Sequence, residues 1–290
     1  MQKMIEKAAV LIEALPYIQR FRGETVVVKF GGSIMDQEAG VASILNDIAF
    51  MACVGLRPVI VHGGGKAINA EMKRRGLRPE FRDGLRVTDE STVRLVEDVL
   101  NHRVNPHMVE VLEGFGCKAR GIHGDDILRV RRLEAKDPAN GEVRDWGFVG
   151  TVEQVDPEPV KAYLSAEIVP AVTPLGRGPD RRVFNVNADE AASALARGLR
   201  ARKLVFLSDV PGVLSDPADE TSIISSLHIG EVEGLIARGA IGGGMLPKIA
   251  GAVNAVREGV SKTHIIDAAL PHSLLLELFT DEGVGTEILT

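Results

Sequence analysis

Residues 25–32 read TVVVKFGG and residues 57–65 read RPVIVHGGG, two β-branched runs that each end in consecutive glycines. Helical periodicity follows each run, over about 38–54 and 66–75. Strands that alternate with helices in this way are typical of βαβ units and a mainly parallel sheet. Open sheets of this kind bind ligands at the carboxyl ends of their strands, where both glycine turns lie. The sequence therefore predicts an α/β protein with two candidate ligand-binding turns.

The alternation of strands and helices continues toward the C-terminus. We expect further strands at 167–172, 203–209, 262–267 and 285–289, and helices at 88–104, 157–165, 186–199, 229–238, 246–258 and 272–280. Segments 117–133 and 143–155 are less regular and indicate strands and hairpins. Pro106 should break or restart the helix before it, because proline cannot donate the helical hydrogen bond. Together these elements predict a three-layer αβα protein with an open, mainly parallel sheet.

An additional helix is expected ahead of the first strand. Apolar residues recur there at helical spacing, at Ile5, Ala8, Ile12 and Leu15. Glu6 and Glu13 interrupt the apolar centre that a secretory signal needs, and acidic residues are rare in transit peptides. We therefore expect a retained helix that ends near Pro16, in a cytoplasmic protein.

Composition excludes several classes of function. The 290 residues carry a net charge of −6, which gives no broad attraction for nucleic acid. No apolar run approaches the ~20 residues that span a bilayer, so no membrane partner is expected. Cys53 and Cys117 lie far apart in apolar stretches and are expected to be buried free thiols. The cysteines and histidines show no metal-ligand spacing, which predicts no metal held by protein side chains.

The glycine turns do not match the common phosphate-binding motifs. Neither fits G-x-x-x-x-G-K-[ST] or a full G-x-G-x-x-G, so a P-loop and a Rossmann fingerprint are excluded. His62-Gly63-Gly64-Gly65 is similar to the oxyanion loop of lipases, but that function requires a G-x-S-x-G nucleophile elbow. Met35 stands where its closing glycine would follow Ser33. An acyl hydrolase is therefore not favoured.

Two lysines accompany glycine-rich turns. Lys29 lies at the end of an apolar strand, where an ammonium group is costly to bury unless it meets an anion. Lys248 follows a third glycine-rich turn, 242–247, that opens a helix. Phosphoryl transfer needs positive charge around the transferred group, which two such lysines could supply. A surface role for either lysine alone stays open.

Two further segments lie at the borders of predicted strands or helices. Residues 185–189 read NVNAD at the start of a helix, where Asx residues either cap the helix or serve a site. Asp209 and Pro211-Gly212 follow the strand at 203–209 and could line a nucleotide pocket.

Taken in order, six fragments resemble the amino-acid kinase family, most closely its acetylglutamate kinases: VVVKFGGS, VIVHGGGKAIN, DGLRVTD, VFNVNADEAA, LVFLSDVPGVL and GGGMLPKI. The resemblance runs from about Thr25 to the C-terminus. It implies an amino-acid kinase fold and transfer of phosphate from ATP to the γ-carboxylate of N-acetyl-L-glutamate, in arginine biosynthesis. Mg²⁺ would be held by ATP rather than by the protein.

The resemblance also implies residue roles. Lys29 and Lys248 would stabilise the transition state, and Asp189 would orient both through ion pairs. Acceptor binding would use backbone and side-chain groups of Gly32, Gly64, Gly65, Arg86 and Asn185. The nucleotide would be held by Asp209, Val210, Pro211, Gly212, Val213, Leu214, Ala240, Ile241 and Gly242.

Domain organisation and regulation follow from the same resemblance. Residues 1–22 would be an oligomerisation helix, 23–178 a lobe for acceptor binding and dimerisation, and 179–290 a lobe for ATP. The protein would be a homo-hexamer, a trimer of dimers, inhibited by L-arginine bound near Tyr17, His264, Glu282 and Gly285. The alternative is that the first helix covers a sheet edge and that 279–285 form a simple turn.

Two departures and two rival functions stay open. Pro106-His107 and Gly124-Asp125-Asp126-Ile127 differ from the family pattern, which leaves the local helix and the middle hairpin uncertain. A related kinase could instead act on an aminoadipate derivative, a substrate one methylene longer. Pocket residues discriminate weakly between substrates that differ by one methylene. A catalytically silent arginine or nucleotide sensor would share the fold, although retention of Lys29, Asp189 and Lys248 argues against it.

Overall fold

A central sheet organises the computed structural model, which describes residues 1–136, 143–280 and 283–290. Eight strands lie in the order β12-β14-β13-β11-β1-β2-β8-β5, and only the β13–β14 pair is antiparallel. Their bounds are β1 (Thr25–Phe30), β2 (Arg57–His62), β5 (Ala119–Ile122), β8 (Val169–Val172), β11 (Lys203–Ser208), β12 (Ser226–His228), β13 (Lys262–Asp267) and β14 (Thr286–Leu289). The predicted open, mainly parallel sheet is confirmed.

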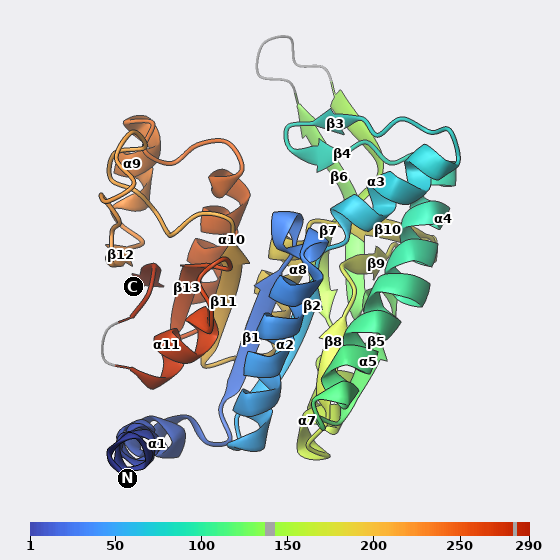
Figure 1. Cartoon of the computed structure of the whole chain (residues 1–290). Helices are drawn as coiled ribbons and strands as arrows, with labels where there is room; N and C mark the ends of the chain where they lie inside the picture. The colour runs from blue at the N-terminus through green and yellow to red at the C-terminus, as the bar shows by residue number, and fades with distance from the viewer. Residues whose placement is uncertain (137–142, 281–282) are drawn as a thin grey trace.

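Helices cover both faces of this sheet (Figure 1). In β1, Val26, Val28 and Phe30 enter one core while Val27 enters the other, because side chains alternate along a strand. One face is covered by α2 (Glu38–Cys53), α5 (Asn105–Gly114) and α11 (Ser273–Phe279), and the other by α7 (Glu158–Ser165), α8 (Ala188–Leu199) and α10 (Met245–Arg257). Three further helices, α3 (Gly65–Arg74), α4 (Glu90–Val99) and α9 (Val232–Ala237), lie beside these layers. This arrangement confirms the three-layer αβα prediction.

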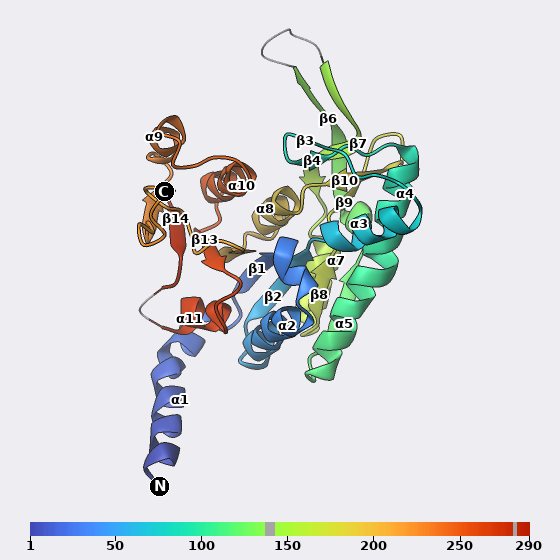
Figure 2. The same cartoon turned by 45° about the horizontal axis from the view of Figure 1, so that its top comes forward.

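The irregular middle of the chain forms a second, smaller sheet. Four strands close into a barrel: β6 (Leu128–Lys136), β7 (Val143–Val155), β9 (Leu175–Arg177) and β10 (Val183–Val186). The β6–β7 pair extends beyond the main sheet, beside the short hairpin of β3 (Phe81–Arg82) and β4 (Leu85–Arg86) (Figures 1 and 2). The indole N–H of Trp146 donates to Arg82 O at 3.0 Å and ties the two hairpins together.

The helical run around Pro106 does not break. A five-residue π-helical stretch, Leu100–Val104, joins α4 to α5, and the N–H of Asn105 donates to Leu100 O five residues back. The wider π turn accommodates the missing N–H of Pro106, which then occupies the first turn of α5. The segment Gly124–Ile127, the other departure from the family pattern, is a single helical turn between β5 and β6.

Two smaller predictions were wrong. Helix α1 (Gln2–Phe21) continues past Pro16, because Tyr17, Ile18 and Phe21 pack against the core and hold the last turn in place. Cys53 is exposed and Cys117 half-buried, because both follow the last buried turn of a helix, although both thiols are free as expected.

The two predicted lobes share one continuous sheet, since β1 pairs directly with β11. The predicted boundaries at 22 and 178 remain predictions. Within the described residues, no helix combines the length and apolar character needed to cross a membrane.

Candidate active site

The two glycine turns lie against each other at one edge of the sheet. β1 and β2 are parallel neighbours, with Phe30 opposite His62 at their ends. The N–H of Gly63 donates to Phe30 O at 2.8 Å. A β-carbon added to Gly31 would stand only 3.2 Å from the α-carbon of Gly63, so side chains are excluded from this contact.

Both turns present backbone N–H groups. Within residues 1–136, 143–280 and 283–290, the N–H groups of Gly32, Gly64 and Gly65 have no protein acceptor. Gly65 begins α3, so the dipole of that helix adds to the field at the second turn. Such a cluster of N–H donors suits an anion.

A buried carboxylate joins the two predicted lysines. Lys29 Nζ lies 2.6 Å from Asp189 Oδ1, and Lys248 Nζ donates to Asp189 Oδ2 at 3.0 Å. The three side chains come from β1, α8 and α10, so strand and helix ends that are distant in sequence meet here. Asn187 is the N-cap of α8, and its side chain accepts from the N–H groups of Asp189 and Glu190. Asn187 therefore caps α8, whereas Asp189 contacts the two lysines.

Burial and neighbouring charges shift the pKa values of both Lys29 and Asp189. Burial lowers the pKa of Lys29, against the opposing effect of the Asp189 carboxylate. Burial alone would raise the pKa of Asp189, but the two ammonium groups outweigh it and hold that pKa below its ordinary value. Two cations thus share one anion, which leaves positive charge beside the glycine turns.

Arg86 and Asn185 meet through Thr88 near the start of α3. The Arg86 guanidinium is buried, donates to Gly65 O at 3.2 Å and to Asn69 Oδ1 at 2.5 Å, and lies over the ring of Phe81. Thr88 Oγ1 donates to Arg86 O at 2.8 Å and accepts from Asn185 Nδ2 at 3.5 Å. A guanidinium fork in this position suits a carboxylate.

The predicted nucleotide loops lie at the end of β11 and before α10. Asp209 is exposed, Val210, Pro211 and Leu214 are half-buried, and Gly212 and Val213 are buried, with the Val213 N–H donating to Thr286 Oγ1 at 2.8 Å. In the second loop Ile241 is buried, while Ala240 is partly accessible and Gly242 is exposed. The buried members shape these loops, and the accessible ones are free to contact a ligand.

The family model described as "Amino acid kinase family" matches residues 24–267. The chain belongs to the amino acid kinase family. Two curated relatives carry the name acetylglutamate kinase. One, from Heliobacterium modesticaldum, is 47% identical over 294 residues and covers 100% of both chains. The other, from Symbiobacterium thermophilum, is 45% identical over 290 residues and covers 99% of each.

Solved structures extend the comparison. An N-acetylglutamate synthase from Neisseria gonorrhoeae, in complex with coenzyme A and N-acetyl-glutamate, has a TM-score of 0.84 and 27% identity. The match covers 98% of the present chain but only 63% of that synthase chain. The same synthase has also been solved with coenzyme A and L-arginine, with a TM-score of 0.80, 26% identity, and coverage of 97% and 65%.

Several site residues of this amino acid kinase escaped sequence reasoning. His62 and Asn105 form a buried hydrogen bond behind the second glycine turn, and Thr88 links Arg86 to Asn185. The sequence does mark two of these positions, since His62 precedes three glycines and Asn105 precedes Pro106 in a helix. Neither pattern alone separates a ligand contact from core packing.

The carboxylates near the site bear on whether side chains could hold a metal ion. Among the described residues, no group of three or more histidine, cysteine, aspartate or glutamate side chains is arranged to hold a metal ion. Asp189, the buried carboxylate of the Lys29–Lys248 cluster, is already paired with two lysines.

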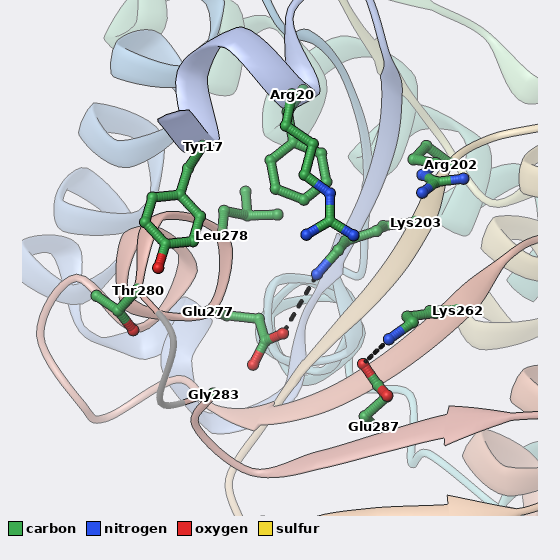
Figure 3. Close-up of a pocket in the computed structure, with 11 residues that line it drawn as sticks. Tyr17, Arg20, Arg202, Lys203, Lys262, Glu277, Leu278, Thr280, Gly283 and Glu287 are labelled. Atoms are coloured by element: carbon green, nitrogen blue, oxygen red, sulfur yellow. Dashed lines mark hydrogen bonds and ion pairs between the residues drawn. The ribbon is translucent and has the colours of Figure 1, made fainter. Parts of the chain in front are cut away.

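A separate cavity of about 210 Å³ lies between α1, α11 and the strands β11, β13 and β14 (Figure 3). Of the residues predicted for arginine binding, Tyr17 lines it. His264 lies behind it, with Nδ1 2.7 Å from the Glu277 carboxylate. Gly285 is not in its lining and instead packs against the carbonyls of Ile265 and Pro211, while Glu282 lies outside the described residues.

Charged residues that the sequence reasoning did not select dominate this cavity. Lys203 and Glu277 point toward each other at 3.4 Å, and Lys262 pairs with Glu287 at 2.8 Å (Figure 3). Burial would raise the pKa of Glu277, but His264 and Lys203 outweigh it and lower that pKa, so the carboxylate is ionised.

Proposed function

We propose that this chain is a cytoplasmic acetylglutamate kinase, which transfers the γ-phosphoryl group of ATP to the γ-carboxylate of N-acetyl-L-glutamate. The observation that carries the proposal is the Lys29–Asp189–Lys248 cluster beside two glycine turns whose N–H groups at Gly32, Gly64 and Gly65 meet no acceptor among the described residues. The names and full-length coverage of the relatives support it. The product would be an acyl phosphate that serves arginine biosynthesis.

The chemistry follows from the charges. A γ-carboxylate oxygen attacks the γ-phosphorus, a new P–O bond forms, and the bond to the β,γ-bridging oxygen breaks with its electron pair leaving on ADP. The acceptor is already ionised at pH 7, so the reaction needs no general base. Lys29 and Lys248 offset the charge on the transferring group, while Asp189 holds both ammonium groups in place.

Acceptor and nucleotide would bind on different sides of the transferred group. Arg86 would hold the α-carboxylate through its guanidinium fork, with Asn185 beside it. The loops at 209–214 and 240–242 would contact the nucleotide. Magnesium, when bound through the phosphates, would neutralise part of their charge.

An ADP-release assay tests the proposal. The purified chain would receive MgATP with N-acetylglutamate, glutamate, aspartate or N-acetylaminoadipate, and hydroxylamine would trap any acyl phosphate as a hydroxamate. We expect ADP and hydroxamate in equal amounts with N-acetylglutamate, and far less with the other acceptors. ADP without hydroxamate, or a preference for N-acetylaminoadipate, would reject the assigned acceptor chemistry.

We further propose that L-arginine inhibits the enzyme by binding in the cavity of Figure 3. The side-chain oxygens of Glu277 and Glu287 in its lining suit a guanidinium, which has five donors and no acceptor. Lys203 and Arg20 in the same lining suit the α-carboxylate. The related synthase solved with L-arginine supports the choice of ligand.

Helix α1 would also carry assembly into a hexamer. Its first three turns expose Met4, Ile5, Val10, Leu11 and Ile12, and the helix extends away from the remainder of the chain (Figure 2). Burial of this apolar stretch against a second copy would join dimers into a trimer of dimers.

A further inference from the structure

His62 is held by hydrogen bonds on both sides of its ring. The side chain is completely buried. Its Nδ1 lies 2.9 Å from Gly63 O, and its Nε2 lies 3.0 Å from Asn105 Nδ2. The same amide nitrogen donates to Ala171 O of β8 at 2.8 Å.

These contacts fix where the imidazole carries its proton. Ala171 O is only an acceptor, so the Asn105 group that faces it must be the amide NH₂. That NH₂ can only donate to His62, so Nε2 is unprotonated and the proton lies on Nδ1. Nδ1–H therefore donates to Gly63 O. Burial lowers the pKa of His62 to about 4, which keeps the ring neutral at physiological pH.

The bond to Gly63 O has a consequence for the next N–H group. A trans peptide is planar, and its C=O and N–H point in opposite directions. The carbonyl of Gly63 and the N–H of Gly64 belong to one such plane. Since His62 holds the carbonyl toward the core, the Gly64 N–H points away from the core, and no described protein group accepts from it.

The surrounding fold is shaped to bring Asn105 to this place. The π-helical stretch before Pro106 contains Asn101, and Asn105 follows it as the first residue of α5; both asparagines are buried. Asn105 reaches His62, while Asn101 accepts from Thr173 Oγ1 at 2.8 Å and makes no contact with the glycine turn. A β-carbon at Gly121 would stand 2.0 Å from Asn105 Oδ1, so β5 accepts only glycine opposite this amide.

We propose that His62 and Asn105 are a positioning pair that aims the Gly64 N–H at the oxygens of the reacting groups. This inference rests on the proposed kinase function. The pair touches no substrate; it acts by fixing the peptide plane between Gly63 and Gly64.

Two amide substitutions of His62 test separately the two hydrogen bonds that its ring makes, one to Gly63 O and one to Asn105. In His62→Asn, the amide nitrogen replaces Nδ1 and keeps the donor to Gly63 O. In His62→Gln, the amide reaches the position of Nε2 and keeps only the contact with Asn105. Loss of a single oriented donor lowers turnover roughly hundredfold in other enzymes. We expect His62→Gln to lose kcat by that order with little change in KM for ATP, and His62→Asn to retain most of the kcat.

Asn105→Leu and Asn101→Leu form the matched pair for the helix, because both remove a buried amide, one from the π-helical stretch and one from the residue that follows it. We expect Asn105→Leu to lower kcat per folded molecule and Asn101→Leu to keep it, with thermal unfolding measured for each. Equal kcat in His62→Asn and His62→Gln, or equal losses in the two leucine variants, would overturn the positioning role.

Nitrogen NMR of the wild-type protein labelled with ¹⁵N-histidine gives a readout that does not depend on turnover. One neutral imidazole should carry its proton on Nδ1 and stay neutral through pH 5, and its signal should vanish in His62→Asn. A proton on Nε2 of this residue would overturn the inference even in an active enzyme. A wild-type chain that releases no ADP with N-acetylglutamate would instead reject the proposed function, while the NMR result would still decide the bonding of His62.

Discussion

Lys29, Lys248 and Asp189 show how charge is balanced at the scale of single residues. Lys29 and Asp189 are both buried, and desolvation of either ion alone would cost several kcal/mol. The ion pairs offset that cost, yet one carboxylate serves two ammonium groups. Under the proposed function, an anionic phosphoryl group would match the excess of one positive charge. A purely structural ion pair would not need this imbalance.

Lys29→Ala and Lys248→Ala should each lower turnover by orders of magnitude, because loss of one donor to a developing charge costs ~3–4 kcal/mol. Steady-state kinetics of both variants provide the measurement. Lys161→Ala is the matched control, since Lys161 pairs with Glu158 at 2.8 Å on the surface and should have no effect. Near-normal turnover in either site variant would remove that lysine from the mechanism.

Arg86→Ala should mainly raise the KM for N-acetylglutamate, because the guanidinium fork would lose its carboxylate without affecting the nucleotide loops. Arg82→Ala, on the neighbouring strand of the same hairpin, is the control: its guanidinium is exposed and pairs with Glu80. An unchanged KM for N-acetylglutamate together with a raised KM for ATP would contradict the assignment.

The buried His62 predicts a pH dependence of stability. Below about pH 6.5 the unfolded chain binds a proton at this residue, whereas the folded chain does not until about pH 4. Falling pH therefore favours the unfolded state across this window, by about 3 kcal/mol in total. Urea unfolding of the wild type and of His62→Asn between pH 7 and pH 4 measures the difference. The wild type should lose more stability than the variant; parallel curves would show that His62 does not titrate in this way.

At the scale of elements, sequence patterns predicted strands and glycine turns well and predicted proline effects poorly. The runs at 25–30 and 57–62 became strands with the expected bounds, because β-branched residues and the following glycines agree locally. Pro16 was expected to end a helix, yet core contacts of Phe21 outweighed the local cost. Pro106 was expected to break or restart a helix, and it stands in the first turn of α5 after a π-helical stretch that the sequence did not predict. Strands β9 and β10 were missed, because their pairing in the small barrel depends on distant partners.

Gly31→Ala tests whether the close approach of the two turns matters. The added methyl group would lie 3.2 Å from the Gly63 α-carbon and push the turns apart. The contact is relieved by a shift of a few tenths of an ångström, and since a misplacement of about 1 Å can cost hundredfold in rate, we expect a loss of roughly tenfold. Gly114→Ala is the control, because nothing lies within 4 Å of its added methyl group at the end of α5. Kinetics should show a large loss of kcat in the first variant and none in the second; equal kcat would show that the turns tolerate separation.

At the scale of the whole molecule, one sheet connects the candidate active site to the cavity proposed for arginine. β11 pairs with β1 on one side and β13 on the other, and its first residue Lys203 lines the cavity while its last leads into the predicted nucleotide loop. That Lys29, Asp189 and Lys248 lie together could be expected from the sequence, because they stand in motifs beside strand and helix ends; their catalytic role stays a proposal. Glu277 and Lys203 could not, because their partnership arises only when α11 folds against β11 and no local pattern marks it.

Deletions of α1 separate assembly from arginine binding, because the two depend on different parts of the helix. Residues 1–12 contain the most exposed apolar side chains, whereas Tyr17, Arg20 and Phe21 line the cavity. The full-length chain should have six times the chain mass of 31.1 kDa in solution and should be inhibited by L-arginine at saturating substrates. Removal of residues 1–12 should yield dimers that still bind arginine, measured by calorimetry, and removal of residues 1–20 should abolish binding as well.

Arginine can inhibit only if it binds one arrangement of the two lobes better than another, so the dimers should also lose inhibition if the interlaced helices transmit that preference. A full-length dimer that is indifferent to arginine would reject both the assembly and the regulation, whereas a hexamer that ignores arginine would reject the regulation alone.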